Sequence, residues 1–380
     1  MSLGPGWTGY QWFLALMMLI TGSINTLTTK FADLQEAPGE PGTPVHDFDH
    51  PFLQASGMFI GEFSCLIVFK IWVLYHRCSK KDVDVGNQKF NPLVFLAPAL
   101  CDMTGTSLMY IGLTLTYASS FQMLRGAVII FTGLLSVAFL GRKLEKHHWV
   151  GILFVLIGLI LVGVSDFIFK TPDSGATSTN GVITGDLLIL MAQVIAAIQM
   201  VVEEKFVSGQ NIPPMQGVGW EGLFGFTVLT TLLFPFYFIK VGPPFGNNPR
   251  GVFEDALDGL WQISNNGKIA GGVFGTIVSI AFFNFAGLSV TKEMSATTRM
   301  VLDSVRTLVI WVFSLAVGWE DFQYLQAIGF VILLAGTAVY NDMLFGPLLR
   351  RYGVLAPVQM GSPDERKPLI QDNGRDSNYP

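Results

Sequence analysis

The sequence predicts an all-α polytopic membrane protein with about ten transmembrane helices, arranged as two five-helix repeats of opposite orientation. Three observations lead to this fold class: few charged residues, ten long apolar segments, and a similarity between the two halves of the chain. Of the 380 residues, 51% are hydrophobic and 13% are charged, and the mean hydropathy is +0.49. Soluble domains contain about 25% charged residues, so an ordinary water-soluble fold is excluded. The net charge of −5 argues against a nucleic-acid-binding surface.

Ten apolar segments are each long enough to cross a bilayer, which takes about 20 helical residues. Backbone amides in lipid must be satisfied internally, and segments of this length without strict alternation achieve this as helices. The first segment is expected to be a retained helix, because residues 1–29 contain no Lys or Arg. A cleaved signal peptide is the alternative. We place the segments at residues 8–28, 52–75, 92–113, 118–140, 148–169, 183–204, 220–240, 269–290, 296–317 and 323–345.

Positive charges gather in the loops after the even-numbered segments and in the C-terminal tail, a bias typical of the cytosolic side. The bias predicts that both chain ends are cytosolic; nine helices with a lumenal N-terminus would produce the same bias. The acidic, Pro/Gly-rich stretch 36–51 is expected to be a solvated lumenal linker. Its histidines, His46 and His50, would on the alternative view sense pH or bind a metal weakly. The opposite side carries only Lys30, Lys170, Lys240, Arg250 and Lys268.

The two halves of the chain match when one is shifted by 178 positions, so that segments four and five fall on segments nine and ten. Gly151 then meets Gly329, and Gly158 meets Gly336. A unit of five helices is odd, so two units in one chain must be inverted across the membrane. Inverted repeats are typical of secondary transporters, whose halves rock around a site near the midplane. The expected units are a first repeat at 1–169, a lumenal loop at 170–182, a second repeat at 183–345 and a disordered cytosolic tail at 346–380.

The stretches Ala118–Gly126 (ASSFQMLRG) and Ser295–Arg306 (SATTRMVLDSVR), together with the ten-helix layout, resemble a known family. They are similar to the EamA-like drug/metabolite transporter superfamily, and within it to the nucleotide-sugar-transporter-like solute carrier family 35, F subfamily. The resemblance covers residues 8–345 in layout and is specific in the two stretches. It implies exchange of nucleotide sugars or related anions, although other members carry vitamins, peptides or drugs.

Ionisable residues inside spans are costly and mark functional sites by default. Arg125 lies in the fourth segment, and Arg299, Asp303 and Arg306 share one face of the ninth because they are spaced i, i+4, i+7. Asp303 can pair with one arginine and leave a positive charge for an anionic solute group, which a guanidinium binds bidentately. Gln122 is expected in the same substrate site. A purely structural set of salt bridges between segments four and nine is the alternative.

Two further carboxylates, Glu62 and Asp102, lie inside segments two and three and are candidates for proton coupling. No catalytic constellation and no Gly-x-x-x-x-Gly-Lys-Ser/Thr motif occurs in the sequence. We therefore expect no enzyme, no cofactor and no metal ligand set. The sequence favours a secondary transporter, exchanger or facilitator, of a small polar, anionic solute across an organelle membrane. The competing interpretation is a non-transporting membrane protein that acts through a partner, as a scaffold or as a regulator of another carrier or of cell survival.

The tail contains two short motifs of the kinds that clathrin adaptors bind. One begins at Tyr352 and ends at Leu355, and the other combines Glu365 with Leu369 and Ile370. Such motifs are addresses and not membrane anchors. They predict a lysosomal or late endosomal membrane, with a Golgi or mitochondrial membrane as the alternative. The expected partners are a small-molecule solute, membrane lipid, clathrin adaptors and a second copy of the chain, but no nucleic acid.

Replacing Tyr352, Leu369 and Ile370 together by Ala should move the protein from lysosomes to the cell surface or the Golgi, because both adaptor motifs are then lost. Quantitative co-localisation with a lysosomal marker measures the shift. Replacing Asn378 by Ala, also in the tail, is the matched control. An unchanged distribution of the triple variant would contradict the sorting hypothesis.

Overall fold

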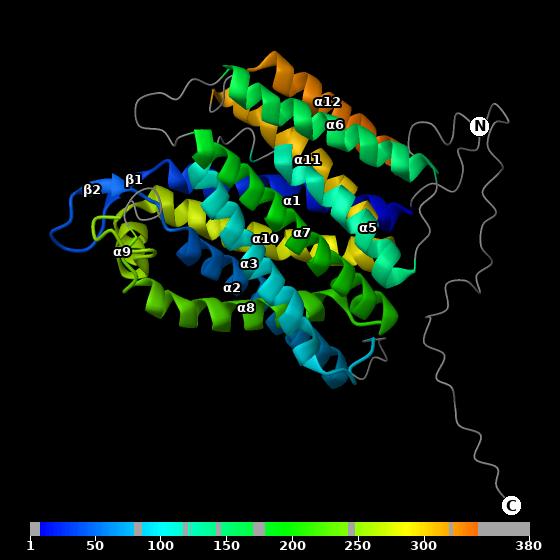
Figure 1. Cartoon of the computed structure of the whole chain (residues 1–380). Helices are drawn as coiled ribbons and strands as arrows, with labels where there is room; N and C mark the ends of the chain where they lie inside the picture. Colours follow the sequence, from blue (N-terminus) through cyan, green and yellow to red (C-terminus); the bar gives the residue numbers. More distant parts are fainter. Residues whose placement is uncertain are drawn as a thin grey trace, which may run out of the picture.

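The computed structural model describes residues 8–79, 86–116, 121, 123–141, 146–169, 179–241, 248–318 and 322–340. In these residues the chain forms helices and one small β-hairpin (Figure 1). A 3₁₀ turn precedes α3 (92–95) and another precedes α5 (125–127). The elements are α1 (Gly9–Asp33), β1 (Glu36–Pro38), β2 (Val45–Asp47), α2 (Pro51–Cys78), α3 (Leu96–Leu115), α5 (Val128–Leu140), α6 (Lys146–Phe169), α7 (Thr179–Gly209), α8 (Pro214–Phe236), α9 (Ala256–Asn265), α10 (Gly267–Glu293), α11 (Ala296–Val317) and α12 (Tyr324–Tyr340).

The prediction of an all-α polytopic membrane protein is confirmed. Within the described residues, eight helices are long and apolar enough to cross a membrane, and the two shorter apolar helices correspond to segments four and ten. Several helices extend by up to about a turn beyond the predicted ends, so His76, in the last turn of α2, and His147, in the first turn of α6, are helical. The short α9 was not predicted, because its ten residues are too few to cross a membrane and carry polar side chains as well as apolar ones.

The helix contacts follow the symmetry of the inverted repeat. The most extensive contacts join α6 to α12, α1 to α10, α2 to α8 and α3 to α7. If the helices of the two halves are matched in order, α6 corresponds to α12 and α2 to α8, and the α1–α10 contact corresponds to α7–α3. Exchanging the two halves therefore leaves the α6–α12 and α2–α8 contacts unchanged and turns the α1–α10 contact into the α3–α7 contact. An inverted repeat requires this correspondence.

The glycines that align between the halves lie where α6 and α12 cross. A Cβ on Gly158 would lie 2.7 Å from the carbonyl oxygen of Gly329, and a Cβ on Gly336 would lie 2.9 Å from that of Gly151. Small residues let helix backbones approach closely in membranes, where van der Waals packing drives association. The glycines that match between the two halves of the sequence thus lie at one symmetric crossing, that of α6 and α12.

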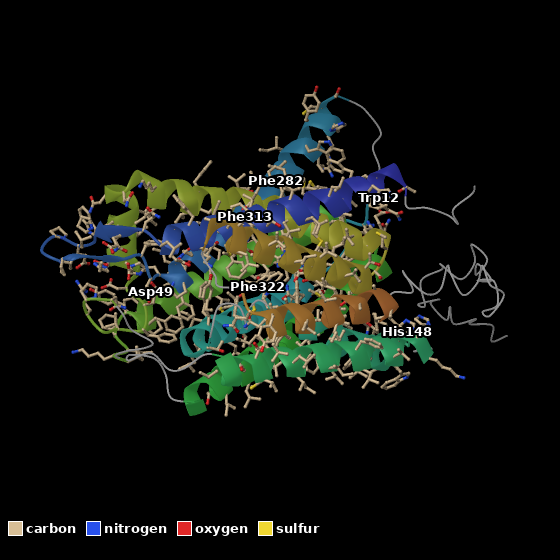
Figure 2. All side chains as sticks on the ribbon, turned by 90° about the horizontal axis from the view of Figure 1, so that it is seen from above. Trp12, Asp49, His148, Phe282, Phe313 and Phe322 are labelled. Carbon is tan, nitrogen blue, oxygen red and sulfur yellow. The ribbon has the colours of Figure 1, made fainter. Side chains whose placement is uncertain are left out.

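The outer surface of the bundle is apolar, as lipid contact requires. Figure 2 shows Trp12, Phe282 and Phe313 on this surface, and each has more than two-fifths of its area exposed. The same view places Asp49, after the hairpin, and His148, at the start of α6, at opposite ends of the molecule. Opposite ends are expected for these two positions, because three of the predicted segments separate them; which end faces the cytosol stays a prediction from the positive charges.

The prediction of a solvated linker between the first two helices is wrong. Strands β1 and β2 pair antiparallel and lie beside α9 at one end of the bundle (Figure 1). Phe48 and His50 are buried, Phe48 in a cluster with Ala32 and Ile269. Gln262 of α9 donates hydrogen bonds of 3.1 Å to two hairpin carbonyls. The linker is ordered because its apolar residues and backbone groups find partners on α9 and α10.

Charged groups pack beneath this hairpin. Burial alone would lower the pKa of His50, but the carboxylates of Asp258 and Glu254 outweigh it and raise that pKa to about 9. Burial would raise the pKa of Asp258, but His50, the Glu40 backbone N–H and His46 outweigh it and lower that pKa to about 2. For Glu254 burial dominates, and its pKa is raised.

Replacing Gly158 by Ala should lower the melting temperature of the detergent-solubilised protein, because the new methyl group meets the Gly329 carbonyl and overpacking costs about 1–3 kcal/mol. Gly163, in the same helix, has open space around the position of a Cβ. Gly163→Ala should therefore be neutral or slightly stabilising, since Ala favours helices by about 0.5–1 kcal/mol over Gly. Equal melting temperatures for the two variants would contradict the close crossing.

Candidate functional site

A cavity of about 360 Å³ lies inside the bundle and is lined by residues of both halves of the chain. The first half contributes residues of α1, α2, α3 and the turn before α5, and the second contributes residues of α7, α8, α10 and α11. Sites of secondary transporters lie at such an interface between repeats. The cavity is therefore the candidate solute site.

Arg125 lies at an irregular point of the fourth span. The chain there forms a 3₁₀ turn, Arg125–Ala127, before α5 begins at Val128. A short 3₁₀ stretch in a helix marks a local break in the regular hydrogen bonding. The guanidinium lies 3.8 Å from a carboxylate oxygen of Asp303 and 5.9 Å from the ring centre of Phe121. No hydrogen bond joins the Arg125 side chain to any other described residue, and the side chain is partly open to the cavity.

Arg306, in contrast, uses all three of its guanidinium nitrogens in contacts within the protein. It forms an ion pair of 2.6 Å with Asp303 and donates a further hydrogen bond of 2.8 Å to the same carboxylate. Nη1 donates to the carbonyl of Gly22 and to the hydroxyl of Thr26, each at 3.2 Å. The guanidinium also lies 4.8 Å from the ring centre of Phe283. Arg306 thus ties α11 to α1 and holds Asp303 in position.

Arg299 forms a buried ion pair with Glu203 of α7. Gln199, one turn earlier on α7, donates a hydrogen bond of 2.8 Å to the other oxygen of Glu203. The start of α11 fixes the position of Arg299. Ser295 caps this helix by accepting from the Thr298 N–H at 3.1 Å. Buried ion pairs need such additional hydrogen bonds to offset the loss of hydration.

Three more carboxylates, Glu62, Asp102 and Glu221, surround the Arg299–Glu203 pair within electrostatic reach. Asn284 of α10 donates a hydrogen bond of 2.5 Å to Glu62. One end of the cavity thus holds a carboxylate cluster around one guanidinium, and the other holds Arg125 beside the Asp303–Arg306 pair. The described lining has four basic and six acidic residues: Lys30, Arg125, Arg299 and Arg306, and Asp33, Glu62, Asp102, Glu203, Glu221 and Asp303.

The structure brings six of the seven residues predicted for substrate binding or proton coupling to this one cavity. Gln122 lies outside the described residues, as do the tail residues Tyr352, Leu355, Glu365, Leu369 and Ile370. The others line the cavity: Arg125, Arg299, Asp303, Arg306, Glu62 and Asp102.

Sequence reasoning missed three of the carboxylates, Asp33, Glu203 and Glu221. Asp33 lies beyond the predicted end of the first segment, and Glu203 and Glu221 each fall within two residues of a predicted helix end, where a charge can reach water. The helices α7 and α8 extend further, to Gly209 and from Pro214, so these last two carboxylates lie within the spans. The Gln199/Glu203 pair at i, i+4 was the one available signal, since such pairs share a helix face.

The inverted bundle and its charged central cavity are features of the transporter class of polytopic membrane proteins. Residues 43–164 match the EamA-like transporter family. A solved crystal structure, 14% identical, superimposes with a TM-score of 0.55 over 91% of this chain and 99% of that one. At this identity the likeness supports the fold alone.

Curated relatives identify the family more closely. Human solute carrier family 35 member F6 is 58% identical over 361 residues, which are 95% of this chain and 96% of the human protein. The rat protein of the same name is 59% identical, over 97% of each chain. A zebrafish probable UDP-sugar transporter protein, SLC35A4, is 27% identical over 58% of this chain and 62% of its own. The chain belongs to the EamA-like, drug/metabolite transporters of solute carrier family 35, and it is not an enzyme.

Replacing Arg299 by Gln should destabilise the protein more than replacing Glu203 by Gln. Without Arg299, the carboxylates around it lose their cation, and removing one partner of a buried pair costs about 3–5 kcal/mol. Without the Glu203 charge, Arg299 still has Glu221, Glu62 and Asp102 nearby. Melting temperatures in detergent measure the difference.

The double variant Arg299→Gln/Glu203→Gln is the control for coupling, and it should be more stable than Arg299→Gln alone because one uncompensated charge is removed. Strictly additive losses would show that the two side chains act independently.

Proposed function

We propose that this chain is a secondary transporter that moves a small polar solute with an anionic group across an organelle membrane, by exchange or by facilitated passage. Family membership supports the transport of a solute. The anionic group is supported by one observation: the Arg125 guanidinium borders the cavity and makes no hydrogen bond to any other described residue. Its nearest carboxylate, Asp303, is shared with Arg306 at a shorter distance. Donors left open in a partly buried site are suited to a phosphate or carboxylate.

Arg299 and Arg306 take supporting roles in this proposal. Their partners within the protein hold them, so they orient Asp303 and the carboxylate cluster and do not have to bind the solute directly. The carboxylates of Glu62 and Asp102 lie close enough to interact electrostatically with each other and with Glu203. Like charges at close range are relieved by binding protons, so this end of the cavity is the proposed site of proton coupling.

The solute class follows from the cavity and from the family. A nucleotide sugar or a related phosphorylated metabolite would place its phosphate at Arg125 and its neutral hydroxyl groups toward Thr106, Ser107 and Tyr110, which also line the cavity. The zebrafish relative is named as a probable UDP-sugar transporter protein. The tail motifs favour a lysosomal or late endosomal membrane, and the two five-helix halves are the proposed moving units.

Purified protein in proteoliposomes should take up radiolabelled nucleotide sugars, nucleotides or small phosphorylated metabolites faster when the same compound is inside. Arg125→Gln should reduce this uptake at least tenfold, because the anionic group loses its cation, and Arg125→Lys should retain part of it. The matched control is Lys70→Gln, since Lys70 lies in α2 but does not line the cavity.

Equal uptake by Arg125→Gln and the unsubstituted protein, per folded molecule, would contradict the anion site. Transport of cationic or neutral solutes alone would contradict it as well. If no solute in the panel is transported by a folded preparation, the competing hypothesis of a regulator or scaffold that acts through a partner gains support.

A further inference from the structure

Three side chains with metal-binding atoms meet beneath the β-hairpin, outside the set of residues that line the cavity. They are His46 and His50, on the segment between α1 and α2, and Asp258 of α9. One nitrogen of each histidine and one oxygen of the aspartate lie within 4.8 Å of one another. His46 Nε2 is 2.7 Å from Asp258 Oδ2, and His50 Nε2 is 3.7 Å from the same oxygen. None of the three lines the cavity.

The other ring nitrogen of each histidine is fixed by an acceptor. His46 Nδ1 lies 2.9 Å from the carbonyl of Pro44, which can only accept, so this nitrogen carries the proton. His50 Nδ1 lies 2.8 Å from Glu254 Oε1, and the second oxygen of Glu254 accepts from the Phe52 N–H at 3.0 Å. Metal-binding histidines in proteins usually donate their second N–H to a carbonyl or carboxylate in this way. Both Nε2 atoms therefore face Asp258. A metal ion would displace the proton that the 2.7 Å contact between His46 Nε2 and Asp258 requires, and would bind both histidines as neutral imidazoles.

His50 Nε2 is the most informative atom. The His50 side chain is 1% exposed, and Nε2 has no hydrogen-bond partner among the described residues. A buried polar atom without a partner needs an explanation, such as an ion. The atom points toward Asp258, at a distance too long for a hydrogen bond. An ion between the two groups would satisfy both.

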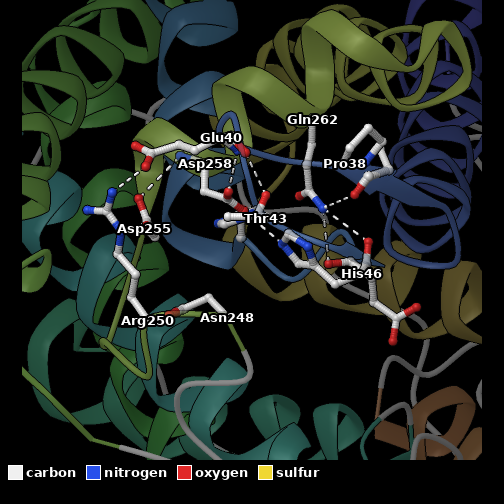
Figure 3. A network of polar contacts seen from close by, with 12 residues as sticks. Pro38, Glu40, Thr43, His46, Asn248, Arg250, Asp255, Asp258 and Gln262 are labelled. Atoms are coloured by element: carbon white, nitrogen blue, oxygen red, sulfur yellow. Dashed lines mark hydrogen bonds and ion pairs between the residues drawn. The ribbon is translucent and has the colours of Figure 1, made fainter.

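The backbone leaves room for these side chains. A Cβ on Gly39 would lie 1.8 Å from Asp258 Oδ1, and a Cβ on Gly259 would lie 2.8 Å from the His50 ring. Figure 3 shows Arg250 directed at Glu40 and Asp255, beside the histidine–aspartate cluster. Arg250 forms an ion pair with each of these two carboxylates. Arg250 thus pairs with Glu40 and Asp255, while Asp258 and Glu254 pair with the histidines.

We propose that His46, His50 and Asp258 bind a zinc ion on the lumenal side of the membrane, with water as the fourth ligand and with Pro44 and Glu254 orienting the histidines. Zinc binds imidazole nitrogen and carboxylate oxygen at about 2.0–2.2 Å with tetrahedral geometry, so neighbouring ligand atoms stand roughly 3.3 Å apart. The observed separations of 2.7 and 3.7 Å bracket this value. Two imidazoles and one carboxylate suit zinc better than calcium or magnesium, which prefer oxygen ligands.

The ligands come from both halves of the chain, so the ion would join the hairpin after α1 to the helix before α10. Metal binding that needs the folded arrangement stabilises that arrangement. Zinc should therefore raise the melting temperature by linking the lumenal ends of the two halves.

The test uses the full chain, purified without a histidine tag and dialysed against a chelator and then against zinc or cobalt(II). Elemental analysis should find one zinc ion per chain, and cobalt(II) should give the strong visible absorption of a tetrahedral complex. His46→Gln and Asp258→Asn should lose the bound ion and the zinc-dependent rise in melting temperature. Glu254→Gln should weaken zinc binding about 10–100-fold. His76→Gln, at the far end of α2, is the matched control and should bind zinc normally.

His46 is partly exposed, so His46→Gln is expected to fold, and its melting temperature in chelator establishes that it does. If that variant is nevertheless destabilised, the cobalt spectrum of the unsubstituted protein decides. Absence of bound metal in the unsubstituted protein, or equal zinc content in His46→Gln, would overturn the proposal and assign the cluster to protonated histidines paired with carboxylates.

Discussion

The cost of placing ionisable side chains inside a lipid bilayer governs the centre of this structure. A charge at the bilayer centre costs at least a few kcal/mol unless it is paired or reaches water. Arg299 meets this cost with Glu203, and Arg306 meets it with Asp303, Gly22 and Thr26. These contacts join α11 to α7 and to α1, so the position of three helices depends on satisfying two guanidinium groups.

The same constraint separates the arginines by role. All three were equivalent candidates for solute binding when only the spacing on the ninth segment was considered. Arg299 and Arg306 each form a hydrogen-bonded ion pair within the protein, with Arg299 Nε left without a partner among the described residues, while Arg125 has a carboxylate at 3.8 Å that is already engaged elsewhere. The sequence predicted an excess positive charge because Asp303 was the one acidic partner considered for the arginines. The lining as a whole has more carboxylates than cations, so the anion-binding argument rests on local geometry at Arg125 and not on net charge.

The sequence predicted the fold well because the bilayer restricts the options. Apolar length located the eight helices of the described residues that are long enough to cross a membrane and the two shorter apolar helices, and the glycine matches pointed to the α6–α12 crossing. Prediction failed where a residue's environment depends on the other half of the chain. Glu203 and Glu221 were missed because the last residues of α7 and the first residues of α8 are less apolar than the rest of each helix, so the predicted segments were too short at these ends. The hairpin was missed because its partners, Gln262 and Asp258, lie more than 200 residues further on.

The repeat also explains why Arg125 and Asp303 meet. The two positions are equivalent under the shift of 178 residues, and equivalent positions of a two-fold repeat can touch only near its axis. The α6–α12 and α2–α8 contacts, likewise between equivalent elements, lie on the same axis. Because opposite charges occupy these two equivalent positions, the two halves attract each other there without identical side chains facing. A solute group bound at Arg125 would sit close to the axis about which inverted halves rock, at similar depth from either side of the membrane. Competition between that group and Asp303 for Arg125 would then couple solute binding to the contact between the halves.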